Sequence, residues 1–87
     1  MNAQERARNE LSSGAKFPYD GGREFWVGGD IPPPKSRDWA HLAARGILSD
    51  LTDRRGLKHT LKDLDHETRA GLVESLSEII RQAHAVS

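Results

Sequence analysis

The sequence has no cysteine among its 87 residues, so neither a disulfide nor a cysteine-ligated metal can stabilise the fold. Hydrophobic residues make up only 36% of the chain. A chain of this length lies near the lower limit for a self-sufficient hydrophobic core. We therefore expect one small domain over residues 1–87, which buries additional surface by forming a homo-oligomer.

The sequence also lacks net charge and long apolar runs. Thirteen basic residues balance thirteen acidic ones, so the chain as a whole has no attraction to duplex DNA or to an anionic membrane. No run approaches the length of a transmembrane helix, and the polar N-terminus is unlike a signal peptide. These absences predict a soluble, cytoplasmic protein.

Motifs of catalysis are missing as well. The sequence has no G-x-S-x-G, H-E-x-x-H or P-loop pattern. Asp63, Asp65 and His66 lie near His59 in the chain, as metal ligands would, but Asp65 is better explained as a helix cap. We expect a protein that is not an enzyme and that has no metal or cofactor.

Residues 65–86 carry the clearest helix signal. Their apolar side chains recur at intervals of three and four residues, which is typical of one face of a helix. Asp65 can cap the first turn. This apolar face is longer than an alanine-rich partner helix can cover. Part of it is therefore expected to lie in the oligomer interface, which would contain Leu72, Leu76, Ile79, Ile80 and Ala83.

A second helix is predicted over about residues 37–55, between a Ser36 cap and Gly56 in a left-handed conformation. Its expected buried face consists of Ala40, Ala43, Ala44, Ile47, Leu48 and Leu51. Residues 57–64 form a connector with one short helical turn, after which the longer helix returns antiparallel. The fold class is therefore all-α, with an antiparallel helical hairpin over residues 36–87. Such a long connector and an acidic second helix disfavour helix-turn-helix DNA binding.

The N-terminal part of the chain carries weaker signals. Residues 1–14 are expected to form a weak helix ended by Gly14, or to be disordered. Residues 15–35 are rich in glycine and proline, which predicts an irregular, extended arm. Within this arm the segment REFWV, between two glycine pairs, is predicted to form one short strand.

All five aromatic residues of the chain lie between positions 17 and 39. Either these side chains complete the core of the helices, or some of them line a ligand pocket or a groove between subunits. We expect Trp26 to belong to the core and Tyr19 to face a ligand.

A local excess of positive charge follows the first of the two predicted helices. From Arg54 to Lys62 the chain has four basic residues, one histidine and no acidic residue. Guanidinium groups bind phosphate through paired hydrogen bonds, and an aromatic side chain can stack on a base. A solvated loop whose cations suit the helix end is the alternative. The predicted anion site consists of Arg45, Arg54, Arg55, Lys58 and His59 for phosphates, with Tyr19 or Trp26 for the base.

The second half of the chain resembles small proteins encoded by bacteriophages and prophages. The shared pattern is R-G-I-x-x-D-L-x-D-R-R-G-hydrophobic-K followed by E-I-I-R, matched by residues 45–58 and 78–81. The layout of an aromatic-proline arm and two helices is also similar to that of phage anti-defence sponge proteins. Those proteins oligomerise and sequester the cyclic nucleotide signals of CBASS or Thoeris immunity.

The resemblance implies a phage counter-defence protein that sequesters a small cyclic nucleotide in the cytoplasm of the host cell. Two alternatives stay open. One is a protein-binding inhibitor of a host defence complex, comparable to an anti-CRISPR protein, and the other is a structural phage component. The resemblance assigns no role to any particular residue.

Overall fold

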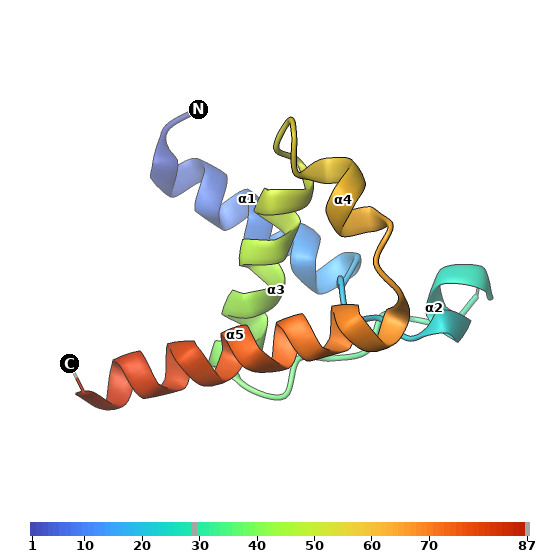
Figure 1. Ribbon diagram of the computed structural model, residues 1–87. Helices are drawn as coiled ribbons and strands as arrows, with labels where there is room; N and C mark the ends of the chain where they lie inside the picture. Colours follow the sequence, from blue (N-terminus) through green and yellow to red (C-terminus); the bar gives the residue numbers. More distant parts are fainter. Residues whose placement is uncertain (29, 87) are drawn as a thin grey trace.

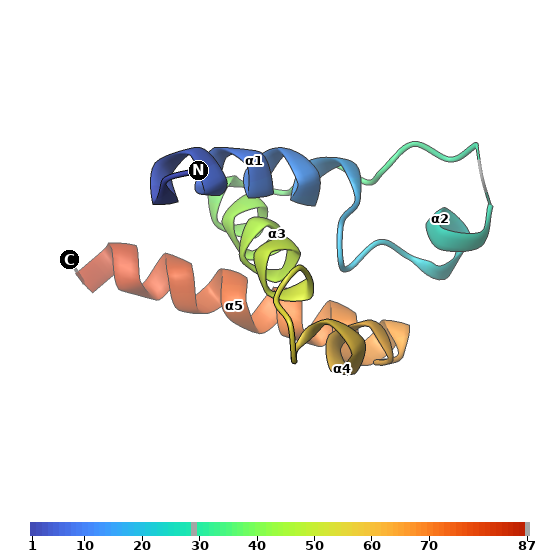
Figure 2. The ribbon, with the colours of Figure 1, turned by 90° about the horizontal axis from the view of Figure 1, so that it is seen from above.

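The computed structural model describes residues 1–28 and 30–86, which form helices and connecting segments but no strand (Figure 1). The helices are α1 (Ala3–Lys16), α2 (Arg23–Val27), α3 (Trp39–Thr52), α4 (Lys58–Lys62) and α5 (His66–Val86). The predicted all-α class is confirmed. Helix α3 lies at the centre, with α1 and α5 packed on two of its sides (Figure 2). Within the described ranges, no helix is both long enough and apolar enough to cross a membrane.

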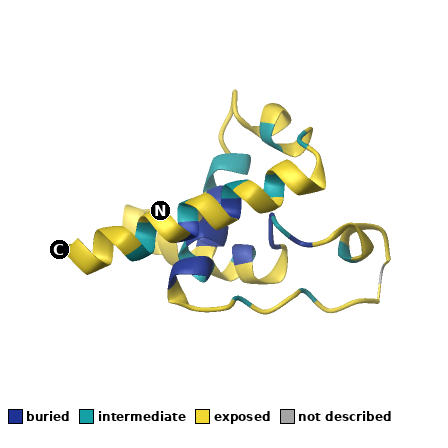
Figure 3. Cartoon of the chain, turned by 60° about the horizontal axis from the view of Figure 1, so that its bottom comes forward, coloured by how far each residue is buried: buried dark blue, intermediate teal, exposed yellow. Residues whose placement is uncertain are grey.

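Helix α5 crosses α3 obliquely and does not run alongside it (Figure 1). The hairpin prediction is correct for the contact between these helices, which run in opposite directions (Figure 2), but they cross obliquely and are not aligned side by side. Around the crossing, Ala44, Leu48, Val73 and Tyr19 form the core, each no more than 5% exposed. Buried residues gather at this crossing, while the C-terminal turns of α5 are exposed (Figure 3). An oblique crossing covers only the middle of α5, where Val73 and Ser77 are buried.

The predicted interface face of α5 is divided by this packing. Leu72, Leu76 and Ile80 are partly buried against the chain's own core. Ile79 remains 60% exposed, and Ala83 is also exposed. Oligomerisation stays a prediction. Of the five predicted interface residues, Ile79 and Ala83 are the ones whose side chains are exposed enough to contact another subunit.

The caps of the long helices follow simple chemistry. At α5, the carboxylate of Asp65 accepts the N–H of Thr68 at 2.7 Å, as predicted. At α3, the cap is Asp38, whose carboxylate accepts the N–H of His41 at 2.9 Å, and the Ser36 prediction is wrong. Gly56 has the predicted positive φ, +93°, but it lies in the turn before α4 because α3 already ends at Thr52.

The predicted buried face of α3 is correct in its centre. Ala40, Ala44 and Leu48 are buried, whereas Ile47 is 42% exposed. Ile47 lines an open groove between α1 and α3, together with Ala3 and Ala7 of α1. Helix α4 is the short helical turn expected in the connector.

Helix α1 packs on α3, as the first of the two predictions for residues 1–14 expects. The side chain of Asn2 caps it by accepting the N–H of Glu5 at 2.8 Å. Gly14 does not end this helix, which continues to Lys16. A Cβ at Gly14 would lie 2.7 Å from the carbonyl carbon and oxygen of Arg45. The missing side chain therefore allows the backbones of α1 and α3 to come into contact.

The arm contains a helix where a strand was predicted. Residues 23–27 form α2, whose start is marked by hydrogen bonds from the N–H groups of Phe25 and Trp26 to the carbonyl of Gly22. A strand needs a neighbouring strand to satisfy its backbone, and none is described, whereas a helical turn satisfies its backbone locally. Residues 31–36, which include the three prolines, run without regular secondary structure.

Candidate functional site

A groove of about 430 Å³ lies where the arm meets the ends of α1 and α3 and the start of α5. We call it the aromatic groove, and it is lined by Ser13, Phe17, Tyr19, Trp26, Ser49, Thr52, Asp53, Lys62 and Arg69. These residues come from every helix of the described chain and from the arm. The groove therefore depends on the complete tertiary structure.

Arg69 is the central cation of this groove. Its guanidinium carbon lies 4.5 Å from the ring centre of Tyr19 and 5.0 Å from that of Trp26. Its Nε is enclosed and has no hydrogen-bond partner. In the part of the chain that the structure describes, no carboxylate forms an ion pair with this arginine. Contact with two rings contributes only about 0.5–2 kcal/mol, so the guanidinium can still bind an anion.

Tyr19 forms the buried wall of the groove and also belongs to the core. Only 5% of it is exposed, and its hydroxyl donates to the carbonyl of Leu61 at 2.6 Å. Burial raises the pKa of its hydroxyl, and the nearby charge of Arg69 opposes that rise. Tyr19 is therefore a core residue, and its contact with a ligand in the groove stays a prediction. Its ring packs with Ala44 and Leu48 of α3 and Val73 of α5.

Trp26 was predicted to belong to the core, and this prediction is wrong. It is 42% exposed and is not part of the core cluster. Its ring meets Phe25 edge-on, with centres 5.3 Å apart, and its face lies against Arg69. The short helix α2 projects from the body (Figure 2), so core packing does not cover the indole. Trp26 is thus available to stack against a flat ligand.

A buried polar cluster holds the arm against α3. The carboxylate of Asp20 accepts Nε of Arg45 at 2.7 Å and lies 2.8 Å from Nε2 of His41. Nδ1 of His41 accepts the N–H of Arg37, so Nε2 carries the proton that is donated to Asp20. Arg45 also donates to the carbonyl of Pro34 at 2.6 Å. These bonds fix the arm on both sides of α2 and thereby position Tyr19.

The structure does not bring the predicted basic group together. Arg45 is 3% exposed and is fully engaged with the arm. Arg54, just after the end of α3, pairs with the carboxylate of Asp50 at 3.1 Å. The other predicted cations, Arg55, Lys58 and His59, are exposed in the turn before α4 and in α4 itself. Of the seven residues in the predicted ligand site, only Tyr19 and Trp26 line the aromatic groove.

Sequence reasoning missed Lys62 and Arg69 as groove residues. Lys62 belongs to the basic run but lies at its end, and Arg69 reads as an ordinary polar residue in the first turns of a helix. The one available signal was that Arg69 follows the Asp65 cap by four residues, on the side that meets the arm. That side was not known before the arm was placed.

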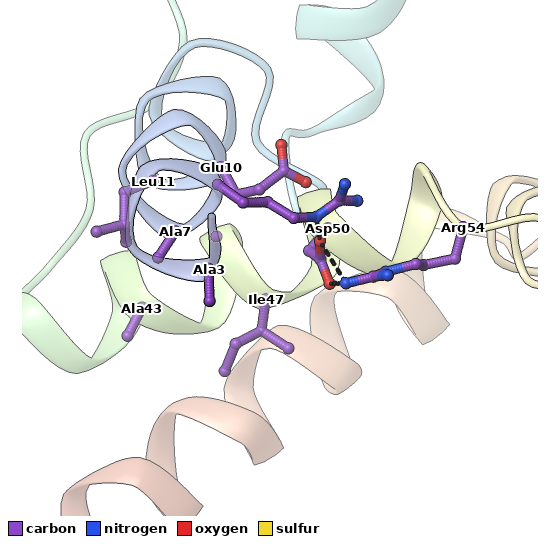
Figure 4. A pocket seen from close by; sticks show the side chains of 10 residues that line it. Ala3, Ala7, Glu10, Leu11, Ala43, Ile47, Asp50 and Arg54 are labelled. Carbon is purple, nitrogen blue, oxygen red and sulfur yellow. Dashed lines mark hydrogen bonds and ion pairs between the residues drawn. The ribbon is translucent and has the colours of Figure 1, made fainter. Parts of the chain in front are cut away.

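A second groove, of about 390 Å³, lies between α1 and α3 (Figure 4). It is lined by Ala3, Arg6, Ala7, Glu10, Leu11, Ala43, Gly46, Ile47, Asp50 and Arg54. Its two cations are both bonded to the carboxylate of Asp50. Glu10 is 8% exposed, and burial, followed by the charges of Asp53 and Asp50, raises its pKa. Because its cations are already paired beside these acids, this groove is poorly suited to an anion.

Metal binding has no support in residues 1–28 and 30–86, where no three histidine, aspartate or glutamate side chains gather closely enough to hold an ion. Comparison of the chain with protein-family models, with curated proteins and with solved structures gives no match. The functional interpretation therefore depends on the chemistry of the aromatic groove.

Proposed function

We propose that this protein binds a small anionic nucleotide in the aromatic groove and sequesters it without converting it. The observation that supports this most directly is the environment of Arg69, a partly buried guanidinium that lies on two aromatic rings and has no carboxylate partner in the described chain. A buried cation is ordinarily paired, since removing its charge from water is unfavourable. A ligand phosphate would supply the missing partner.

Other residues of the groove can bind the phosphate and the base of a nucleotide. Lys62 adds a second cation for the phosphate, and the half-exposed Trp26 offers a face on which a base can stack. Phe17 is 65% exposed at the same groove and can cover the other face of the base. A volume of about 430 Å³ lies within the ordinary range for small-ligand pockets, about 300–1,000 Å³.

The biological setting in this proposal follows from the resemblance to phage proteins. A phage-encoded protein that holds a cyclic nucleotide would suppress an immune signal in the host cytoplasm. Several copies acting as a homo-oligomer would bind several molecules of the signal. The cations and aromatic rings of the groove suit the binding of a nucleotide, and we propose capture of the ligand and not its cleavage.

A protein-binding inhibitor of host defence is the second candidate. Apolar side chains of the arm and of the start of α3 support it, because Val27 is 75%, Trp39 55% and Ile31 43% exposed. Exposed aromatic and aliphatic groups of this kind are enriched in protein interfaces. A structural role in the phage particle would use the same surface.

Isothermal titration against cyclic di- and trinucleotides and cyclic ADP-ribose isomers tests the first candidate. We expect one of them to bind with a Kd below about 10 µM. Arg69→Gln and Lys62→Ala should each weaken binding roughly 10- to 100-fold, the value of a charge-assisted hydrogen bond. Heat denaturation should release the nucleotide chemically unchanged.

The matched control is Arg55→Ala with Lys58→Ala, which removes two exposed cations outside the groove. This double variant should bind as tightly as the wild type. If it loses binding while Arg69→Gln and Lys62→Ala retain it, the ligand lies at the basic turn and the aromatic groove is not the site. If no nucleotide binds below about 10 µM, a protein target becomes the leading candidate.

A further inference from the structure

The aromatic groove contains a carboxylate that phosphate binding does not explain. Asp53 caps the C-terminal end of α3, lines the groove and is exposed. In the described parts of the chain, no arginine, lysine or histidine forms an ion pair with it. An acid in an anion site repels the ligand unless it meets a hydrogen-bond donor of that ligand.

The acid and the cations of the groove enter from different elements. Asp53 is the C-cap residue of α3 and lies beside Glu10 of α1. Burial raises the pKa of Glu10, and the charge of Asp53 and its hydrogen bond with the Glu10 side chain add to that rise. Lys62 comes from α4, and Arg69 comes from α5 and lies against the arm. A ligand in this groove therefore meets a hydrogen-bond acceptor on one wall, cations on another, and aromatic rings at Trp26 and Phe17.

Guanine is the base whose edge fits a carboxylate best. An ionised carboxylate only accepts hydrogen bonds, through two neighbouring oxygens. Guanine presents two adjacent donors, N1–H and the N2 amino group. Adenine and cytosine place a ring-nitrogen acceptor beside their amino donor, and uracil places its single N–H between two carbonyls. For these three bases a carboxylate oxygen would face an acceptor.

We propose that the aromatic groove is selective for guanine nucleotides, with Asp53 accepting N1–H and the N2 amino group while Lys62 and Arg69 hold the phosphate. The purine ring lies against Trp26, which favours a two-ring base over a pyrimidine by its larger stacking area. This inference depends on the proposed nucleotide-binding function and adds to it the identity of the base. Asp53 thereby becomes the residue that determines specificity.

Titration with matched nucleotides tests this assignment in the wild-type protein. The probes are the guanine, hypoxanthine and adenine forms of the 3′,5′-cyclic mononucleotide and of the cyclic dinucleotide. Hypoxanthine keeps N1–H and lacks the N2 amino group, so it isolates one of the two bonds. We expect affinity to fall from guanine to hypoxanthine to adenine, with about a 10- to 100-fold difference between the first and the last.

The Asp53→Asn variant should remove most of this difference, because an amide offers one acceptor and one donor where the carboxylate offers two acceptors. Asp63→Asn is the matched control, since Asp63 is an exposed acid outside the groove, and it should keep the wild-type preference. Melting curves and light scattering of both variants check that fold and assembly are retained. If Asp53→Asn does not fold, the order of the three bases in the wild type still decides the question.

Each outcome has a distinct meaning. Equal binding of guanine and adenine nucleotides by the wild type, or an unchanged preference in Asp53→Asn, overturns the guanine assignment and leaves nucleotide binding intact. Binding of none of the mononucleotides or dinucleotides, in this set or in the wider panel, overturns both proposals. A preference for adenine would show that Asp53 does not contact the base through its carboxylate.

Discussion

The docking of α1 on α3 can be tested with three Gly→Ala substitutions that differ only in what the new methyl group meets. At Gly71, in α5, a Cβ has nothing within 4 Å. At Gly46, in α3, it would lie 2.9 Å from the end of the Leu11 side chain. At Gly14, in α1, it would lie 2.7 Å from backbone atoms of Arg45. The series therefore runs from open space through a movable neighbour to an immovable one.

The expected free energies follow from these contacts. Replacing a helical glycine by alanine gains about 0.8–1 kcal/mol, so Gly71→Ala should raise the melting temperature by roughly 4–8 °C. Leu11 can rotate away from a methyl at position 46, and that variant should stay close to the wild type. Overpacking costs about 1–3 kcal/mol, and backbone atoms cannot rotate away. Gly14→Ala should therefore be destabilised by up to about 2 kcal/mol, on the order of 10 °C.

The assay is thermal unfolding followed by circular dichroism, with all variants at one protein concentration so that any assembly contributes equally. Amide hydrogen exchange of α1 adds a local measurement, since Gly14→Ala should accelerate exchange in residues 3–16 more than in α5. A Gly14→Ala protein that melts as high as Gly71→Ala would refute the reasoning. It would mean that α1 does not contact α3 in solution, as in the disordered alternative that the sequence left open.

Two further predictions concern pH. Asp38 has its pKa lowered to about 2, first by Arg81 and then by the N–H of His41, so its stabilisation is complete above about pH 4 and is lost as the pH falls toward 2. Asp38→Asn should flatten this part of the stability curve in acid denaturation, and an unchanged slope would contradict the ion pair with Arg81. Glu10 has its pKa raised, chiefly by burial, so its ionisation destabilises the fold as the pH rises above about 4.5. Glu10→Gln should therefore raise the melting temperature at pH 7 and have little effect at pH 4, whereas a drop at pH 7 would show that the carboxylate is stabilising.

Local chemistry allowed the long helices to be predicted from the sequence. The three-four spacing of apolar residues in α5, the Asp65 cap and the short turn at α4 all depend on residues within about one helical turn of one another. The same holds for the left-handed conformation of Gly56, which needs no distant contact. Such signals suffice for the all-α class and for the existence of α3, α4 and α5.

Elements with weak local signals could not be assigned in this way. The apolar residues of α1 are mostly alanine and would not hold an isolated helix, and its packing depends on the approach of Gly14 to Arg45 across 31 positions of sequence. The segment REFWV has strand-forming residues, yet the described chain has no strand with which it can pair. The crossing angle of α5 likewise reflects the shape of the core, which no single segment encodes.

The candidate site shows the same division most clearly. The sequence by itself determined that aromatic residues are present between positions 17 and 39 and that cations are concentrated between positions 45 and 62. Only the tertiary structure decided which charges are paired: Arg45 forms an ion pair with Asp20, and Arg54 forms one with Asp50. It also decided that the Arg69 guanidinium lies over the rings of Tyr19 and Trp26. The physical reason is that an unpaired charge can be recognised only once every potential partner has been placed in space. Helix caps and periodicity act within a turn, whereas the pairing of a charge is settled by the whole fold.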